Sequence, residues 1–151
     1  VMDLTAALPL LLPKAITWAE DQATHIALTG RALEASQIAL ARSVGVQRPE
    51  AIRLALVTAI PRPADPDLLR ATIATGLLAA DTVGLTLGHG IIVCQGHLSK
   101  RLLSHELRHV HQYEMAGSLA AFLTTYLRQI VDYGYLAAPL EIDARAHEHG
   151  Y

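Results

Sequence analysis

Five residues in the last third of the chain mark the ends of three helices. Serine before a helix caps its free N–H groups, glycine ends a helix, and proline fits the first helical turn. The residues at these positions are Ser99, Gly117, Ser118, Gly134 and Pro139. They predict helices over residues 99–116, 118–132 and 139–148. The C-terminal part of the chain is therefore expected to be helical.

The preceding residues predict a mixture of helices and strands. Apolar spacing favours helices over 13–28 and 31–43, divided at Gly30, and another over 67–80. Alternation favours a strand over 52–60, although Pro49–Glu50 could also start a helix there. Residues 83–94 predict a strand or bent strand, with Gly88 and Gly90 at a bulge or close backbone approach. We expect a helix-dominated α+β fold.

Composition excludes several classes of protein. The chain has 151 residues, which predicts a single domain over 1–151, with an N-terminal helical part (1–48) and a core over about 50–151. A hydrophobic content of 52% excludes a disordered chain, and a net charge of -2 argues against nucleic-acid binding. A single cysteine excludes an internal disulfide and a cysteine-based zinc site, whereas eight histidines are many for this length.

The sequence contains no convincing targeting or membrane segment. The apolar run from Leu4 to Leu12 contains Pro9, is followed by Pro13, and has no basic residue before it, unlike a signal peptide. No apolar stretch is long enough to cross a bilayer. We therefore expect a cytoplasmic protein that does not bind membranes.

The sequence HELRH at residues 105–109 is an HExxH motif in the middle of a predicted helix. Residues four apart lie on one helix face, so His105 and His109 can bind the same Zn²⁺ ion. Glu106 then stands beside the metal, where it can act as general base toward metal-bound water. A structural zinc site has no use for such a glutamate and tends to fill all four positions with protein ligands.

Two histidines and a water leave a zinc site one protein ligand short. Asp132, Glu141 and Asp143 follow the motif and could supply a third ligand. A carboxylate in a first helical turn is also favoured by the helix dipole, so Glu141 and Asp143 each have a structural explanation. Spacing alone does not decide whether Glu141 or Asp143 is the third ligand.

Several segments resemble a family of small bacterial zincin-type proteins. These segments are HELRHVHQYE, GSLAAFLTTYL, GY followed by APLEIDARA, and the preceding GLTLGHGIIV. The similarity covers about residues 83–148 and extends loosely back to about residue 30. The family comprises minigluzincin-like zinc metallopeptidases related to a domain associated with extracellular contractile injection systems. The resemblance implies a zincin-like fold with a small sheet and an HExxH active-site helix.

The resemblance also implies which residue is the third ligand. Its E-x-x-A pattern matches Glu141 followed by Ala144, so the expected zinc ligands are His105, His109 and Glu141. Many gluzincins carry an aspartate four residues after this ligand, which orients a zinc-bound histidine. That position is Arg145 here, which makes Asp143 the candidate for the orienting role.

Other polar residues could complete an active site. Tyr126, Tyr133, Tyr135 and His111 are candidates to stabilise an oxyanion. Tyr135, in the loop before the Glu141 helix, is the catalytic candidate, whereas Tyr126 lies among core residues. His111 lies off the ligand face and is expected to support the site or lie on the surface. The strand from Leu85 to His89 could pair with an extended substrate, and the alternative is an ordinary edge strand.

The sequence thus predicts a zinc metallopeptidase acting on a peptide or protein. One alternative is a zinc-bound regulatory or interaction module without catalysis. Another is a latent peptidase whose histidine-rich C-terminal segment or N-terminal region blocks the cleft. Glu106, Tyr135 and the three ligands carry the leading hypothesis, while the oligomeric state is left open.

Overall fold

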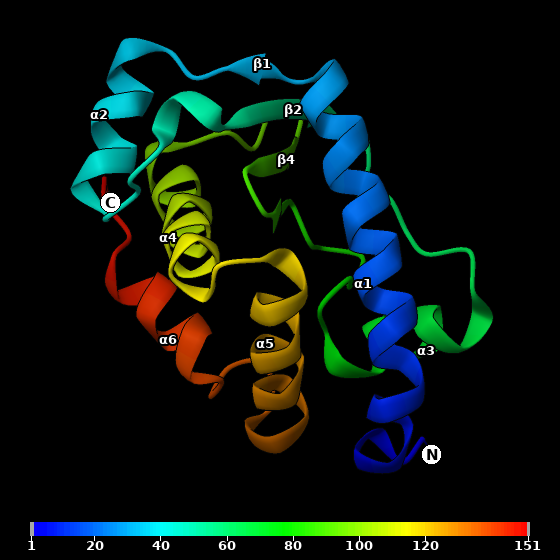
Figure 1. Cartoon of the computed structure of the whole chain (residues 1–151). Coiled ribbons are helices and arrows are strands. Elements are labelled where there is room, and N and C mark those ends of the chain that lie inside the picture. Colours follow the sequence, from blue (N-terminus) through cyan, green and yellow to red (C-terminus); the bar gives the residue numbers. More distant parts are fainter. Residues whose placement is uncertain (1, 151) are drawn as a thin grey trace.

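The computed structural model describes residues 2–150; Val1 and Tyr151, the two ends of the expected domain, lie outside the described residues. The fold is α+β and rich in helix, with a small mixed sheet, as the sequence predicts (Figure 1). The helices are α1 (Leu4–Thr29), α2 (Ala35–Ser43), α3 (Pro66–Thr75), α4 (Lys100–Ala116), α5 (Leu119–Tyr133) and α6 (Pro139–Ala146), with a 3-10 turn at Pro49–Ala51. The strands are β1 (Arg31–Ala32), β2 (Arg53–Val57), β3 (Gly84–Leu87) and β4 (Gly90–Cys94).

The four strands form one sheet in the order β1-β2-β4-β3. β2 and β4 are parallel, with Leu54 opposite Ile91, whereas β3 is antiparallel to β4, with Leu85 opposite Ile92. β4 is therefore a central strand, and β3 is an outer strand whose far edge is unpaired among the described residues.

Each face of the sheet is covered by helices. Because side chains alternate along a strand, Ile91 and Val93 pack with α2 and α4, while Ile92 packs with α1 and α5. Figure 1 shows α2 beside α4 and the long α1 on the other side of the sheet. β4 is buried on both faces, which explains its run of apolar residues.

The N-terminal helix begins earlier than the sequence predicts. We expected a helix start at Pro13, but α1 starts at Leu4, with Asp3 as its cap, and continues through Pro9 and Pro13. Each proline removes one backbone N–H from the helix, which is usually unfavourable. Burial of the apolar side of α1, including Leu11, against the rest of the fold compensates for that loss.

Other boundaries also differ from expectation. The helix expected over 67–80 is α3, which ends at Thr75, and the strand expected over 52–60 is β2, which ends at Val57. Residues 31–32 form the short strand β1 rather than the start of a helix, so α2 begins only at Ala35. The expected bent strand at 83–94 is a hairpin, β3–β4, with Gly88 in the left-handed region (φ 68°) at its turn. This hairpin places β3 against α4, beside the HExxH motif.

The three predicted C-terminal helices are confirmed. Ser99 and Ser118 cap α4 and α5 through their side chains, and Gly117 and Gly134 end them. α6 begins at Pro139 and ends at Ala146, two residues earlier than expected. Among residues 2–150, no helix combines the length and apolar character that a membrane crossing requires.

Candidate metal centre

The two histidines of the HExxH motif lie side by side on α4. Leu103, Leu107 and Val110 of the same helix are buried against the sheet. This packing fixes the rotation of α4, so that His105 and His109 lie on the opposite side of the helix from these three residues, one helical turn apart. Their ring centroids are 5.0 Å apart.

Helix α6 brings Glu141 to these two rings. Glu141 lies in the first turn of α6 and is 1% exposed. Its Oε1 is 3.1 Å from His105 Nε2, and its Oε2 is 3.0 Å from His109 Nε2. One ligand atom from each residue lies within 4.8 Å of the other two, so this buried group could hold a metal ion.

The spacing suits a metal with short ligand bonds. Tetrahedral ligand atoms that lie about 2.0–2.1 Å from a metal are separated by about 3.3–3.4 Å. Each Nε2 lies at about this separation from one oxygen of the Glu141 carboxylate, 3.1 Å to Oε1 for His105 and 3.0 Å to Oε2 for His109.

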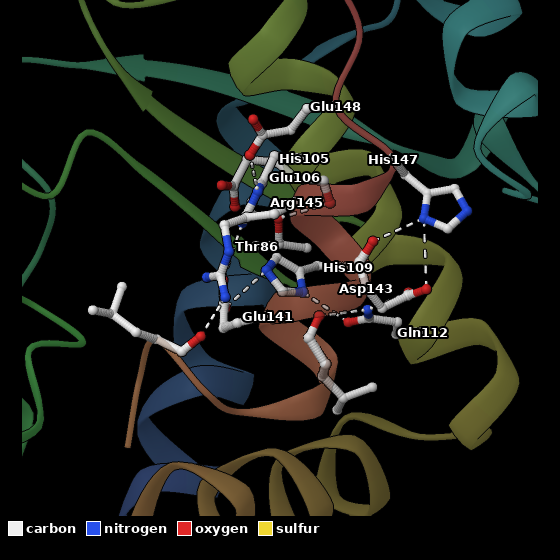
Figure 2. A network of polar contacts seen from close by, with 12 residues as sticks. Thr86, His105, Glu106, His109, Gln112, Glu141, Asp143, Arg145, His147 and Glu148 are labelled. Carbon is white, nitrogen blue, oxygen red and sulfur yellow. Dashed lines mark hydrogen bonds and ion pairs between the residues drawn. The ribbon is translucent and has the colours of Figure 1, made fainter. Parts of the chain in front are cut away.

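The outer ring nitrogens fix the tautomers of both histidines. His105 Nδ1 is 2.8 Å from Glu148 Oε2, and His109 Nδ1 is 2.8 Å from Gln112 Oε1 (Figure 2). The Gln112 amide nitrogen donates to the Leu140 carbonyl and to Asp143, which establishes that its oxygen faces His109. Because a carboxylate and an amide oxygen only accept, each Nδ1 carries a hydrogen. Each Nε2 faces an oxygen of the Glu141 carboxylate, to which it donates when protonated. A metal bound here would take the place of that hydrogen.

The electrostatics of the cluster favour a bound cation. Burial alone lowers the pKa of His105, but the carboxylates of Glu141, Glu106 and Glu148 outweigh it and raise the pKa to about 9. Burial likewise opposes ionisation of Glu141, yet the two imidazoles and Tyr126 hold its pKa well below the usual range. A divalent cation can replace the protons that the ring nitrogens otherwise hold next to the Glu141 carboxylate.

Tyr126 of α5 is a direct neighbour of the cluster. Its hydroxyl donates to Glu141 Oε2 at 2.6 Å. Its ring stacks on Phe122 and meets His109 edge-on. We predicted a core residue, and the ring does pack with the core, but the hydroxyl also restrains the Glu141 carboxylate.

Glu106 lies beside the cluster and is held by the edge strand. The Thr86 hydroxyl of β3 is 2.8 Å from Glu106 Oε1, and the Glu106 side chain makes no hydrogen bond to His105, His109 or Glu141 among the contacts within residues 2–150. Gly84 of β3 leaves room for this carboxylate, because a Cβ at that position would lie 3.2 Å from Glu106 Oε2. Glu106 is buried, yet it lines the cleft described next.

A largely apolar cleft opens onto the candidate metal centre. It is lined by residues of α1, α3, β3, α4, α5 and α6 and of the loop between α3 and β3. His105, Glu106, His109, Glu141 and Tyr126 form its polar side. The large apolar side chains on its other walls are Trp18, Leu68, Leu77, Leu78, Leu85, Leu87, Phe122, Leu123 and Leu127.

Tyr135 also lines this cleft, a position that its predicted catalytic role requires. Burial raises the pKa of its hydroxyl, and the negative charges of Glu141 and Glu106 raise it further. The hydroxyl is therefore protonated at neutral pH and can donate a hydrogen bond. Tyr133, an alternative candidate, is 59% exposed and does not line the cleft.

Three other predicted site residues do not touch the ligand cluster. His111 faces Gly45, with its Nδ1 2.9 Å from the Gly45 carbonyl oxygen. His89 lies in the β3–β4 turn, where it pairs with Glu114. Asp143 binds Arg108 and the Gln112 amide, so it reaches His109 only through Gln112 rather than orienting a histidine directly.

The C-terminal segment, residues 147–150, does not enter the cleft. His147 Nδ1 is 2.8 Å from the Asp143 carbonyl oxygen, and the His149 backbone N–H donates to Ser104 Oγ. No described residue of this segment lines the cleft. The histidine-rich segment therefore gives no support to a blocked site, which was one of our alternatives.

Sequence analysis missed four residues that contact the site. Gln112 lies three residues after His109, on the same side of the helix, and that spacing could have indicated it. Glu148 lies two helical turns after Glu141, a weaker signal. Thr86 and Gly84 carry no signal of their own, because their role depends on the packing of β3 against α4.

The comparisons with known proteins identify no relative of this chain. No protein family, no curated protein and no solved structure shows a significant match to it.

Proposed function

We propose that this chain is a zinc-dependent metallopeptidase of the zincin type, with a minigluzincin-like fold. The observation that carries the proposal is the position of Glu106. Its carboxylate adjoins the His105–His109–Glu141 cluster in the same cleft, is restrained by Thr86, and is not itself one of the converging ligands. A metal site with only a structural role has no need for a carboxylate in that position.

Zinc is the metal that the donor set favours. Two imidazoles and one carboxylate are a ligand set of catalytic zinc sites, which leave a position open for water or substrate. The second ring nitrogen of each histidine is hydrogen-bonded, as is usual for histidines that bind metals. The ligands also border an open cleft, so a substrate can reach them.

The residues around the cluster can carry out amide hydrolysis. Zinc bound here supplies a Lewis acid that polarises the substrate carbonyl and lowers the pKa of a water molecule. Glu106 accepts a proton from the attacking water at a carboxylate oxygen. It delivers that proton to the leaving nitrogen as the C–N bond breaks. The Tyr135 hydroxyl, which is protonated at neutral pH, donates to the developing oxyanion.

The cleft indicates what kind of peptide binds. Its apolar walls favour a large apolar side chain next to the scissile bond. Within residues 2–150 no strand pairs with the outer edge of β3 beside Glu106, and an extended peptide can pair with it through main-chain hydrogen bonds. We therefore propose substrates that are extended peptides or exposed protein loops with a bulky apolar residue at the cleavage position.

The test combines metal analysis with a cleavage assay. Elemental analysis of wild-type protein should give about one zinc per chain, and Glu141→Ala should lose it. A peptide-library digest, read by mass spectrometry, should show cleavage by the wild type. Glu106→Gln should keep zinc and reduce cleavage by about 10²–10⁴-fold.

The control is Glu50→Gln, which makes the same chemical change at an exposed residue outside the cleft and should leave both readouts unchanged. Zinc binding without any cleavage by the wild type would favour the non-catalytic interaction module. Absence of zinc from folded wild-type protein that has been incubated with zinc would overturn the proposal.

A further inference from the structure

His105 has a carboxylate on the side of its ring that faces away from the cleft. Its Nδ1 lies 2.8 Å from Oε2 of Glu148, a residue that follows the end of α6. The same ring directs Nε2 toward Glu141. Glu148 thus accepts a hydrogen bond from Nδ1, while Nε2 faces the candidate metal position.

We propose that Glu148 is the positioning residue for His105, and that the C-terminal segment is therefore part of the metal centre. This inference rests on the proposed function, because it assigns a role to Glu148 only if His105 binds metal. A carboxylate on the far ring nitrogen fixes the orientation of an imidazole and increases its basicity as a ligand.

Neither of the nearer candidates occupies this position. Arg145 lies four residues after Glu141, but its guanidinium donates to the backbone carbonyl of Leu136. Asp143 is engaged by Arg108 and Gln112 on the His109 side of the cluster. In Figure 2, Glu148 lies next to His105, and Asp143 lies beside Gln112. The two histidines thus have different supports, a carboxylate for His105 and an amide for His109.

The segment that carries Glu148 is fastened along one face of α4. Ser104 and His105 lie on the same face as Arg101, because they follow it by three and four residues. Arg101 Nε donates to Glu148 Oε1 at 2.9 Å, and Ser104 Oγ accepts from the His149 backbone N–H at 2.8 Å. Arg101 and Ser104 therefore hold the segment against α4, and His105 donates a hydrogen bond to the Glu148 carboxylate.

The environment of Glu148 makes it an effective ionic partner. Its side chain is 10% exposed, and that of His105 is 12% exposed. The other oxygen of Glu148 lies 2.9 Å from Arg101 Nε, so the carboxylate stands between a guanidinium and the imidazole. A carboxylate placed in this way accepts the hydrogen bond from His105 Nδ1, and Nε2 is the ring atom that faces the candidate metal position.

The experiment measures zinc affinity by competition with a chromophoric chelator. The variants are Glu148→Gln, which keeps the side-chain length and removes the charge, and Glu148→Ala. Both should bind zinc more weakly than the wild type, Glu148→Ala by about 10–100-fold and Glu148→Gln by less. Glu50→Gln, the same change at an exposed residue, should bind zinc like the wild type.

A second readout separates positioning from general stability. The visible spectrum of the Co²⁺-substituted protein reports ligand geometry, so Glu148→Gln should shift its absorption bands while circular dichroism stays unchanged. If Glu148→Ala loses helix, Arg101→Ala provides the alternative test, because it releases Glu148 without removing it. Arg101→Ala should then weaken zinc binding by several-fold.

The outcomes distinguish this inference from the proposed function. Unchanged zinc affinity and an unchanged cobalt spectrum in folded Glu148→Gln and Glu148→Ala would overturn the role of Glu148 and leave the zinc site intact. Failure of the wild type to bind zinc would overturn both, because His105 would then have no metal to bind.

Discussion

The Thr86 hydroxyl of β3 lies 2.8 Å from Oε1 of Glu106 on α4. It also lies 3.1 Å from the Glu106 backbone carbonyl, so one edge-strand side chain holds both the helix and its carboxylate. The outer strand β3 therefore fixes the orientation of Glu106, the residue that we propose as general base.

Replacing Thr86 with valine should weaken catalysis without affecting the metal. Valine keeps the shape of threonine but cannot hydrogen-bond, so Glu106 can leave its position. A hydrogen bond to a charged group contributes about 1.5–3 kcal/mol, which corresponds to a loss in kcat of about tenfold or more. Thr86→Ser keeps the hydroxyl and should stay near wild type. Equal turnover numbers for Thr86→Val and wild type would contradict this role.

Gly84→Ala should disturb the same carboxylate by a different route. The added Cβ would lie 3.2 Å from Glu106 Oε2 and 3.2 Å from Leu102 Cδ1, tighter than ordinary contact. Glu106 must then shift, and we expect a several-fold lower kcat. Zinc content, measured on the same sample, serves as the internal control and should be unchanged. Loss of zinc together with activity would indicate wider disruption of the site.

Gln112→Leu should weaken zinc binding from the His109 side. Gln112 accepts from His109 and donates to Asp143 and the Leu140 carbonyl, so leucine removes one hydrogen bond from each of three polar groups. We expect zinc affinity to fall by about tenfold and the free energy of unfolding to fall by about 1–3 kcal/mol. The matched control is Gln95→Leu at an exposed position. Chelator competition and chemical denaturation measure the two effects, and wild-type zinc affinity in Gln112→Leu would contradict this role.

Trp18→Ala should change the substrate preference. Trp18 lines the apolar side of the cleft, so its removal takes apolar contact from a bound side chain. We expect kcat/KM for a peptide with a bulky apolar residue to fall by about tenfold or more relative to its glycine analogue. Tyr133→Ala removes an exposed aromatic side chain outside the cleft and should leave the ratio unchanged. An unchanged ratio in Trp18→Ala would place the substrate side chain elsewhere.

Glu114 should give the metal-free protein part of its resistance to acid. Burial raises the pKa of this carboxyl, but the Gln47 and Arg48 backbone N–H groups and His89 outweigh that effect and lower the pKa. A lowered folded-state pKa stabilises the protein above the unfolded value of about 4.3, and this contribution is lost as the pH falls through the folded pKa.

Glu114→Gln should therefore destabilise the protein at pH 7 by about 1–3 kcal/mol and flatten the fall in stability on acidification. Chemical denaturation between pH 7 and pH 3 measures this, and Glu50→Gln is the control. The same pH slope in Glu114→Gln and wild type would assign the acid sensitivity to other carboxyls.

Local signals in the sequence determined the helices and the core of the candidate site. Ser99, Gly117, Ser118 and Gly134 act on backbone groups within a few residues of themselves, so the ends of α4 and α5 follow directly from the chain. The pairing of His105 with His109 follows from the helical repeat in the same way. The structure brings Glu141, rather than Asp143, to these rings, a choice that spacing along the sequence leaves open.

Only the tertiary structure decided what surrounds those residues. Thr86 reaches Glu106 across 20 residues of sequence, and Glu148 reaches His105 across 43, and neither distance leaves a periodic pattern. The start of α1 at Leu4 and the division of 83–94 into a hairpin likewise depend on packing against other elements. Helical geometry places His105 beside His109, whereas Glu141 and the residues that orient this cluster reach it only when β3, α5, α6 and the C-terminal segment pack around α4.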